Sequence, residues 1–347
     1  MITIDGSMGE GGGQILRYAV ALSAITGEPV KIVNIRAKRS NPGLRPQHMT
    51  AVKTVGLLVD ADIEGLKKGS MTIVFRPRRK VKGGFFKANI GTAGSISLVL
   101  QALLPVAAFA DKATTIRLTG GTSVRNAPPI PYMQAVLVPL LKRMGLDIGI
   151  KILKRGFYPR GGGIVEVSIA PVDTLSPIVL PEWSRLKRFK GLSYSSNLPS
   201  HVVLRQKKAA ENIIVSRGYG EIPRDIRIDW RTPAIDKGSG IVIWAVTDTG
   251  VVGGDALGEK GKPAERVGSE AAEKLLSELE TRAAVDQHAL DNLLIYAALA
   301  SGESMITASH MTLHAETVIE LCKIIVGARF HVEKLGNRVC VRCLGKS

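Results

Sequence analysis

The 347-residue chain contains few cysteines, few aromatic residues and a minority of acidic residues. Its three cysteines, Cys322, Cys340 and Cys343, include one close pair, and a structural zinc site needs a second pair that this sequence lacks. We expect buried free thiols; a disulfide among them would require a heat-adapted source. Such a source is also favoured by the low content of asparagine and glutamine.

The sequence also lacks long hydrophobic runs. The longest, residues 98–110, contains Gln101 and Pro105 and is too short to cross a bilayer. No basic segment followed by an apolar one opens the chain, so no secretory signal is expected. We therefore predict a soluble, cytoplasmic protein without a membrane partner.

Positive charge is abundant: 47 Lys and Arg residues stand against 30 Asp and Glu residues, for a formal net charge of +17. This excess favours a polyanionic partner. Two basic runs, residues 76–80 and 185–190, are explained equally well as solvated strand ends. A further group of cations is interleaved with small and apolar residues: Arg36, Lys38, Arg39 and Arg45.

Helical and strand-like patterns recur three times along the chain, in modules of roughly 85 residues. Each module holds two helix–strand steps and an additional strand, which predicts an α/β (α+β) fold. Helices are predicted at residues 15–27, 46–58, 96–110, 131–144, 286–300 and 314–326. Strands are predicted at residues 1–5, 30–36, 71–75, 88–91, 114–118, 148–154, 164–169, 304–308, 329–334 and 338–344.

Residues 184–277 differ in composition from the three modules. A helix near 203–216, a strand at 240–247 and a charged helix at 264–279 are predicted within them. We interpret this segment as an inserted small α/β domain. The large catalytic domain is then predicted to comprise residues 1–183 and 278–347.

A polar or glycine-rich turn precedes one helix of each module, at residues 9–14, 91–95 and 309–314. Three such turns facing one cleft would bind a polyphosphate, because helix N-termini attract phosphate. The first turn fits neither the Walker A loop nor the dinucleotide fingerprint. Glu10 is its only charge and suits a hard cation such as Mg²⁺. A plain tight turn is the simpler alternative.

The segment 36–48 gathers four cations near the end of a predicted strand. Its Pro-Gly turn presents Gln47 and His48 at the start of a helix. Arginine clusters hold phosphate in a fork geometry that lysine cannot reproduce. The segment therefore favours a phosphate site over a merely solvated loop.

His314 lies at the predicted start of the helix that precedes Gly327, a good stop signal. An imidazole at a helix N-terminus can meet a bound phosphate and, when neutral, attack phosphorus. One alternative gives His310 and His314 ordinary polar roles at the helix end. The other is a zinc pair at i, i+4, which lacks the intervening Glu and an obvious third ligand.

Six groups of motifs occur in order over essentially the whole chain: GEGGGQILR at 9–17, the segment 35–48, Gly94-Ser95 with 98–101, 120–122, 127–129 and 156–163. Their order and spacing closely resemble those of the RNA 3′-terminal phosphate cyclase family. The resemblance implies three repeated β-α-β-α-β-β units that form a large domain, with a smaller inserted α/β domain.

The resemblance also implies a reaction. In that family a histidine attacks the α-phosphorus of ATP, and AMP then passes to the 3′-terminal phosphate of an RNA. The neighbouring 2′-hydroxyl displaces AMP and closes a 2′,3′-cyclic phosphodiester. The family pattern of His, two residues and Thr falls on His314 and Thr317. The implied cofactors are ATP and Mg²⁺ or Mn²⁺, and the implied partner is RNA with a 3′-terminal phosphate.

Further residues are assigned by the same resemblance. Glu10 falls on the metal-binding glutamate. Two departures occur in the nucleotide site: a tyrosine that stacks on adenine is replaced by His288, and an Asp-Gln pair reads Asp291-Asn292. Positions tied to ATP and phosphate binding are Arg17, Arg36, Arg39, Gln47, His48 and Gln101, and positions that line the adenine pocket are Pro128 and Tyr132.

Two other functions were weighed against this one. A non-catalytic sister group of the family acts in ribosome assembly and lacks the histidine nucleophile, which is present here as His314. Enolpyruvyl transferases use a similar repeated module, but they bind small anions that would not call for a charge of +17. The sequence leaves the natural RNA and the oligomeric state open, and a homo-oligomer is compatible with it.

Overall fold

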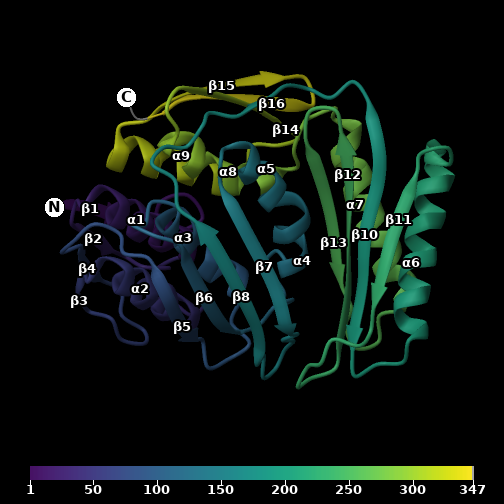
Figure 1. Ribbon diagram of the computed structural model, residues 1–347, viewed down its shortest axis with the longest axis horizontal. Helices are drawn as coiled ribbons and strands as arrows, with labels where there is room; N and C mark the ends of the chain where they lie inside the picture. Colours follow the sequence, from purple (N-terminus) through teal and green to yellow (C-terminus); the bar gives the residue numbers. More distant parts are fainter. Residues whose placement is uncertain (346–347) are drawn as a thin grey trace.

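The computed structural model describes residues 1–345 and contains three β-α-β-α-β-β units (Figure 1). The first consists of β1 (Ile2–Asp5), α1 (Gly13–Thr26), β2 (Val30–Val33), α2 (Pro46–Val59), β3 (Asp62–Glu64) and β4 (Ile73–Arg76). The second consists of β5 (Gly84–Asn89), α3 (Ile96–Ala107), β6 (Thr114–Gly120), a helix in three parts, β7 (Asp147–Lys154) and β8 (Gly163–Ala170). The third consists of β9 (Val179–Leu180), α8 (Gln287–Leu299), β14 (Glu303–Ala308), α9 (Leu313–Val326), β15 (Arg329–Leu335) and β16 (Arg338–Leu344).

The three units share one sheet topology. Their strand orders are β1-β2-β4-β3, β5-β6-β8-β7 and β9-β14-β16-β15. In each sheet the first two strands are parallel and the remaining neighbours are antiparallel. This identity of order and direction confirms the predicted threefold repeat.

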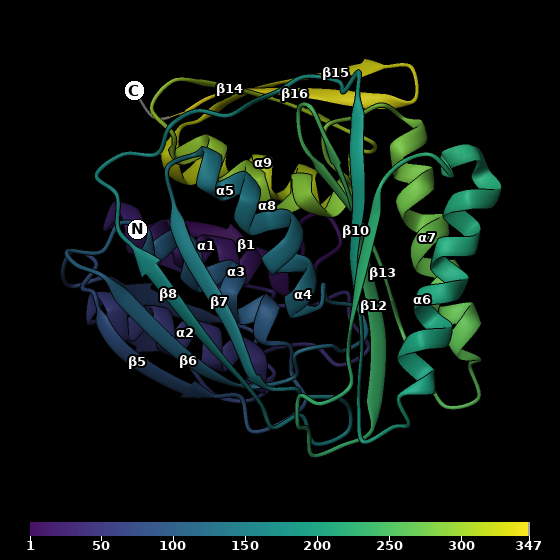
Figure 2. The ribbon, with the colours of Figure 1, turned by 45° about the vertical axis from the view of Figure 1, so that its right-hand side comes forward.

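An inserted unit interrupts the third repeat between β9 and α8. It contains β10 (Leu186–Ser196), α6 (His201–Ile214) with the π-helical turn η2 (Val215–Tyr219), β11 (Arg224–Asp229), β12 (Gly238–Thr247), β13 (Val251–Leu257) and α7 (Ala264–Glu280). Its sheet has a different order, β11-β10-β12-β13. A separate apolar cluster, which includes Phe189, Ile243 and Leu275, packs α6 and α7 against this sheet. Figures 1 and 2 show the two helices on the outer side of the molecule.

Helices α1 and α8 lie in the centre of the repeated units. Every residue from 14 to 24 of α1 and from 289 to 298 of α8 is buried. Helices that are buried on all sides lie in the core of a protein. Each fully buried Leu, such as Leu16 or Leu293, contributes about 1.5–3 kcal/mol of transfer free energy. These two helices therefore form a rigid base for the loops that precede them.

Several predicted boundaries were wrong. Strand β2 ends at Val33 rather than Arg36, because Asn34 and Arg36 adopt positive φ angles of 52° and 55° and leave the extended region. The helix predicted at 131–144 is divided into α4 (Ile130–Tyr132), the π-helical η1 (Met133–Leu137) and α5 (Val138–Arg143). Pro139 follows η1, and because it has no N–H it removes one bond of the α-helical ladder.

The predicted domain limits remain a prediction. Helix α7 continues to Glu280, so the limit at 277/278 lies inside its last turn. The range 278–347 ends with residues 346 and 347, which lie outside the described residues. Cys322, Cys340 and Cys343 are buried free thiols, as expected. Among residues 1–345, no helix has the length and apolarity needed to cross a membrane.

Candidate active site

Glycines allow the loop 9–14 to lie directly against neighbouring segments. Gly9 has a φ angle of +51°, and a Cβ atom there would lie 2.4 Å from Oγ1 of Thr317 on α9. A Cβ atom on Gly13 would lie 2.1 Å from Nε2 of His48 on α2. Any other residue at these positions would displace its neighbour, so the close approach requires glycine.

Glu10 directs the carboxylate of this loop towards Arg39 and His314. Its Oε2 atom accepts a hydrogen bond of 2.7 Å from Nη2 of Arg39 and lies 3.4 Å from Nε2 of His314. The side chains of Glu10 and His314 are 34% and 40% exposed, so a ligand can reach both. Nζ of Lys38 donates to the carbonyl oxygen of Gly9 at 2.9 Å and fixes the loop beside them.

His314 is held in the first turn of α9 from two sides. Thr312 is the N-cap, and its Oγ1 accepts from the backbone N–H of Ala315 at 2.9 Å. The same hydroxyl is hydrogen-bonded to the carboxylate of Asp291 on α8. Nε2 of Gln14, on α1, donates to the carbonyl oxygen of His314 at 3.3 Å. The prediction that a helix begins close to His314 is confirmed, because α9 starts at Leu313.

A chain of side-chain hydrogen bonds, the amide relay, joins one helix from each repeated unit. Nε of Arg17 on α1 donates to Oε1 of Gln101 on α3 at 3.1 Å. Nε2 of Gln101 donates to Oδ1 of Asn292 on α8 at 3.0 Å. Nδ2 of Asn292 donates to the carbonyl oxygen of His288 at 2.7 Å. Both ends of each amide are used, so the relay fixes their orientations.

Burial controls the charge states of Arg17 and His48. Burial lowers the pKa of Arg17 to about 10, so its guanidinium stays charged at neutral pH. Burial, followed by the charges of Arg17, Arg36 and Arg45, lowers the pKa of His48 to about 3. Nδ1 of the neutral imidazole accepts from the backbone N–H of Arg45 at 3.2 Å, so the proton is on Nε2. His48 therefore presents an N–H donor beside Gly13.

The remaining residues of the segment 36–48 mainly shape the loop. Nη1 of Arg36 donates to the carbonyl oxygens of Asn41 at 2.6 Å and Gly43 at 2.9 Å. Burial and the neighbouring charges of Arg45 and Arg39 lower the pKa of Arg36. Oε1 of Gln47 accepts from the backbone N–H of Ser95 at 3.0 Å, which connects the first unit to the turn before α3.

Comparison with known proteins decides the family. A sequence model described as "RNA 3'-terminal phosphate cyclase" matches residues 8–332 of this chain. The chain belongs to this cyclase family. Proteins named RNA 3′-terminal phosphate cyclase from Pyrobaculum aerophilum and Hyperthermus butylicus are 47% and 51% identical to it. The alignments cover 99% and 94% of this chain, and 98% and 92% of those proteins.

A solved structure is also similar to this chain. The crystal structure of the enolpyruvyl transferase NikO from Streptomyces tendae matches 98% of this chain and 48% of that chain, with a TM-score of 0.40 and 9% identity. This similarity is too low to inform on function. Family membership therefore rests on the sequence model and on the cyclase relatives.

The adenine-pocket positions implied by the cyclase resemblance are only partly accessible. Tyr132 is 2% exposed, and its hydroxyl donates to Oδ1 of Asp286 at 2.5 Å. Asp286 also accepts from the backbone N–H groups of Gly253, His288 and Ala289 at 2.8–3.0 Å. Pro128 is half-buried in the segment before α4. His288, by contrast, has a side chain that is 61% exposed.

Replacing Asp286 by alanine should destabilise this region strongly. The variant loses the N-cap of α8 and leaves the buried Tyr132 hydroxyl and the Gly253 N–H without an acceptor. We expect the free energy of unfolding to fall by about 3–5 kcal/mol, from a cap and two unpaired donors. Guanidinium denaturation measures it. Ser95→Ala, which removes a cap that accepts from Leu98 and shares a hydrogen bond with the Ser97 hydroxyl, is the control and should cost only about 1–2 kcal/mol. Equal losses in both variants would contradict the assigned network.

The imidazole of His288 should titrate well above neutrality. Asp291, whose Oδ2 is 3.9 Å from Nδ1, is the main cause, and together with Asp286 and Asp255 it raises the pKa of His288 to about 9. The unfolded pKa of His is near 6.5, so the stabilisation is complete below pH 6.5 and is lost as the pH rises through 9. NMR titration of the ring should show a lower pKa in Asp291→Asn. An unchanged pKa in that variant would exclude this carboxylate as the cause.

The described residues around Glu10 fit a cation that is shared with a nucleotide, and not a metal site made by the protein alone. Among the described residues, no group of three or more His, Cys, Asp and Glu side chains is arranged to hold a metal ion. Glu10 supplies a single accessible carboxylate. Mg²⁺ is commonly held by one or two carboxylates together with substrate phosphates. Glu10 is therefore suited to Mg²⁺ or Mn²⁺ when phosphates are bound beside it.

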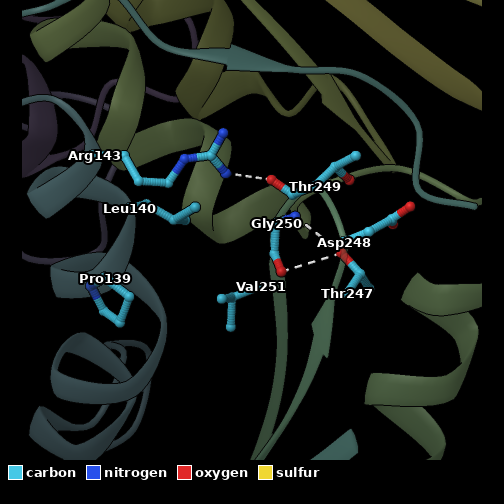
Figure 3. A pocket seen from close by; sticks show the side chains of 8 residues that line it. All are labelled: Pro139, Leu140, Arg143, Thr247, Asp248, Thr249, Gly250 and Val251. Atoms are coloured by element: carbon cyan, nitrogen blue, oxygen red, sulfur yellow. Dashed lines mark hydrogen bonds between the residues drawn. The ribbon is translucent and has the colours of Figure 1, made fainter. Parts of the chain in front are cut away.

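A separate pocket lies between α5 and the β12–β13 hairpin (Figure 3). It is lined by Pro139, Leu140 and Arg143 on the helix side and by residues 247–251 of the hairpin. Arg143 donates to the carbonyl oxygens of Thr249 and, at 3.1 Å, of Val179. None of the residues assigned by the cyclase resemblance lines this pocket, so it is distinct from the candidate site.

The sequence indicates no individual role for Gln14, Lys38 or Thr312, although all three hold segments of the candidate site. Gln14 and Lys38 lie within motifs that drew attention for their neighbours, and their own bonds go to backbone oxygens. Thr312 could have been recognised, because a threonine before an apolar helix is a typical N-cap. The bond between Thr312 and Asp291 depends on the packing of α8 against α9 and leaves no signal in the sequence.

Proposed function

We propose that this protein converts the 3′-terminal phosphate of an RNA to a 2′,3′-cyclic phosphodiester in an ATP-dependent reaction. The observation that carries the proposal is the adjacency of Glu10, in the loop before α1 of the first unit, and His314, in the first turn of α9 of the third unit, 3.4 Å apart. Arg39 and the donor face of His48 lie around the same loop. The names of relatives at 47% and 51% identity support an RNA substrate, as does the net charge of +17.

The chain's own residues would bind and orient the triphosphate of ATP. The guanidinium of Arg39 and the ammonium of Lys38 flank the glycine loop, and Nε2–H of His48 points to it. Fixed donors of this kind stabilise the charge on phosphate oxygens without reorganising during the reaction. A bound Mg²⁺ or Mn²⁺ at Glu10 would supply additional neutralisation of the phosphates.

In the first proposed step, a neutral imidazole nitrogen of His314 donates its lone pair to the α-phosphorus of ATP. A phosphorus–nitrogen bond forms, the bond to the bridging oxygen breaks, and pyrophosphate leaves with that electron pair. Covalent catalysis of this kind divides one difficult displacement into easier ones. Thr312 and Gln14 hold the backbone of His314 and therefore its approach to the phosphorus.

Two further steps complete the proposed reaction. An oxygen of the RNA 3′-phosphate attacks the phosphorus of the histidine–AMP, which transfers AMP and restores the imidazole. The adjacent 2′-hydroxyl then attacks the 3′-phosphorus, loses its proton, and expels AMP. The products are a 2′,3′-cyclic phosphodiester and AMP, and the amount of ATP converted equals the amount of RNA cyclised.

Incubation with ATP labelled at the α-phosphate tests the proposal. The protein alone should acquire the label, and addition of RNA with a 3′-phosphate should discharge it with formation of a phosphatase-resistant RNA end. A ribosome-assembly protein without catalysis would bind but acquire no label. Label that is not discharged by phosphorylated RNA would contradict the proposed substrate.

RNA binding should weaken steeply with salt. Each phosphate neutralised by Lys or Arg releases condensed counterions, with a slope of about −0.7 per contact for a single strand in a plot of log affinity against log salt. Sequence preference should be weak, because phosphate contacts carry no base information. Fluorescence anisotropy of labelled RNAs between 50 and 400 mM salt measures both. Affinity that is independent of salt would be inconsistent with this mode of binding.

A further inference from the structure

One face of the sheet β5-β6-β8-β7 presents exposed and half-buried side chains along its strands. Along β5, Phe85, Lys87 and Asn89 are exposed and alternate with half-buried residues that face the core. In β6, Arg117 lies on the same face as Lys87, its partner in the parallel register, while Ile116 and Leu118 are fully buried on the other. The helices that contact these strands lie behind the sheet in the view of Figure 2. The outer face is therefore available to a partner.

An exposed aromatic ring occupies the edge of this face. Phe85 is 55% exposed, so its ring is accessible to a ligand. Nζ of Lys87 lies 5.3 Å, and Cζ of Arg117 5.9 Å, from the ring centroid. Arg117 is held in place by two hydrogen bonds to Glu166, of 3.1 and 2.6 Å. A ring flanked by cations in this way is suited to a stacked base with its phosphates nearby.

The basic run 76–80 leads directly into this edge. Arg76 and Arg78 form ion pairs with carboxylates of β3. Lys80 and Lys82 are exposed and make no ion pair within residues 1–345. Lys112 lies on the other side of β5, since its Cε would lie 3.9 Å from a Cβ atom on Gly84, which alternates with Phe85 along the strand. The basic run is thus only partly neutralised and immediately precedes β5 in the chain.

Strand β5 connects this surface to the candidate active site. From Phe85 to Asn89 the strand advances about 13 Å, at about 3.3 Å per residue. It then enters the turn 91–95, whose Ser95 N–H is bound by Gln47. A strand of RNA that left the site along this face would pass over Lys87 and Phe85. The order of the elements therefore predicts that bound RNA runs from the candidate site along β5 towards Phe85.

We propose that this face, the Phe85 platform (Phe85, Lys87 and Arg117), binds the single-stranded RNA that precedes the 3′-terminal phosphate. One base stacks on Phe85 while the cations contact the adjoining phosphates. An unpaired base is required, because a base in a duplex cannot lie against a flat ring. Every base has a π face, so the platform discriminates between strands by length rather than by sequence. The proposal rests on the proposed function, which places the 3′ end in the candidate site.

Oligonucleotide length separates the platform from the active site. Phe85→Ala should weaken binding of a 3′-phosphorylated dodecanucleotide by about tenfold, the effect of losing one stacked base, and leave a dinucleotide unaffected. Phe85→Trp should bind the dodecanucleotide and the dinucleotide with the affinities of the unmodified protein. Val332→Ala, an exposed apolar residue on β15, is the matched control and should change neither. Lys87→Gln should reduce the salt slope for the dodecanucleotide by about 0.7.

The possible outcomes are distinct. Equal affinities of Phe85→Ala and the unmodified protein for the dodecanucleotide would overturn the platform, as would full affinity in Phe85→Leu, which keeps apolar area without a π face. In the latter case the patch would suit a protein partner. Formation of the AMP adduct from ATP alone should be the same in all Phe85 variants. If the unmodified protein forms no adduct, the proposed function fails, and binding of an unphosphorylated dodecanucleotide still tests the platform by itself.

Discussion

His314→Ala should abolish formation of a covalent AMP adduct. Removing a covalent nucleophile typically costs on the order of 10⁶ in rate, because the remaining groups cannot form the bond. The variant should still bind ATP, since Arg39, Lys38 and His48 remain around the glycine loop. Gel detection of protein labelled by ATP radioactive at the α-phosphate measures the effect.

Two controls distinguish a nucleophile from a structural residue. His314→Ala should still cyclise an RNA supplied with a 3′-pp-5′A end, because that step needs only the 2′-hydroxyl and AMP as leaving group. His310→Ala should keep the adduct, since His310 lies before the N-cap of α9. Normal labelling of His314→Ala, or its loss in His310→Ala alone, would be incompatible with the assignment.

Glu10→Ala should reduce adduct formation by about 10²–10³-fold, the equivalent of the several kcal/mol that a metal clamp contributes to phosphoryl-transfer chemistry. The variant loses both the cation site and the hydrogen bond that orients Arg39. Glu10→Gln can keep a hydrogen bond to Arg39 but removes the charge. If the loss in Glu10→Ala is caused by the missing cation, adduct formation in Glu10→Gln should be reduced almost as much. If it is caused by the misplaced Arg39, adduct formation in Glu10→Gln should be reduced much less.

A surface carboxylate provides the control for Glu10. Glu28→Ala removes an exposed carboxylate after α1, away from the site, and should leave labelling unchanged. Titration with Mg²⁺ and Mn²⁺ should show a weaker apparent affinity in Glu10→Gln than in Glu28→Ala. Full activity of Glu10→Ala with unchanged metal dependence would show that the loop 9–14 is a simple turn without a role in binding a cation.

The repeated architecture was predictable because it depends on local periodicity. The apolar spacing of α1, α3 and α9 marks amphipathic or buried helices wherever they pack. Strand β9 was missed because its two residues, Val179 and Leu180, become a strand only by pairing with Met305 and Ile306, over a hundred residues later. The π-helical η1 escaped prediction for a related reason, since its register depends on how the ladder adjusts ahead of Pro139.

The sequence located several residues of the candidate site, but not the hydrogen bonds that connect them. Family motifs located Glu10, His48 and His314, and the structure places all three around one glycine loop. The amide relay could not be predicted, because each of its bonds joins helices of different units. The resemblance assigns Tyr132 to an adenine pocket, and that assignment stays a prediction; the bond from its hydroxyl to Asp286 could not be predicted from the sequence.

The relay also explains how the departure at position 292 is accommodated. An asparagine side chain is one methylene shorter than the family's glutamine, yet Asn292 still accepts from Gln101 and donates to the carbonyl oxygen of His288. Both of its polar ends are used, so no buried amide is left unpaired, which would cost about 1–3 kcal/mol. The change to His288 is coupled to the same helix turn, where Asp291 supports the positive charge of the imidazole.

The most direct test of the proposed reaction is to locate the AMP. The protein is labelled with ATP radioactive at the α-phosphate, digested with trypsin under alkaline conditions, and the labelled peptide is sequenced. The label should be on His314, and the bond should be labile to acid and comparatively stable to alkali, as a phosphorus–nitrogen bond is. AMP on His310, on His48 or on any lysine would contradict the role of His314 as the nucleophile.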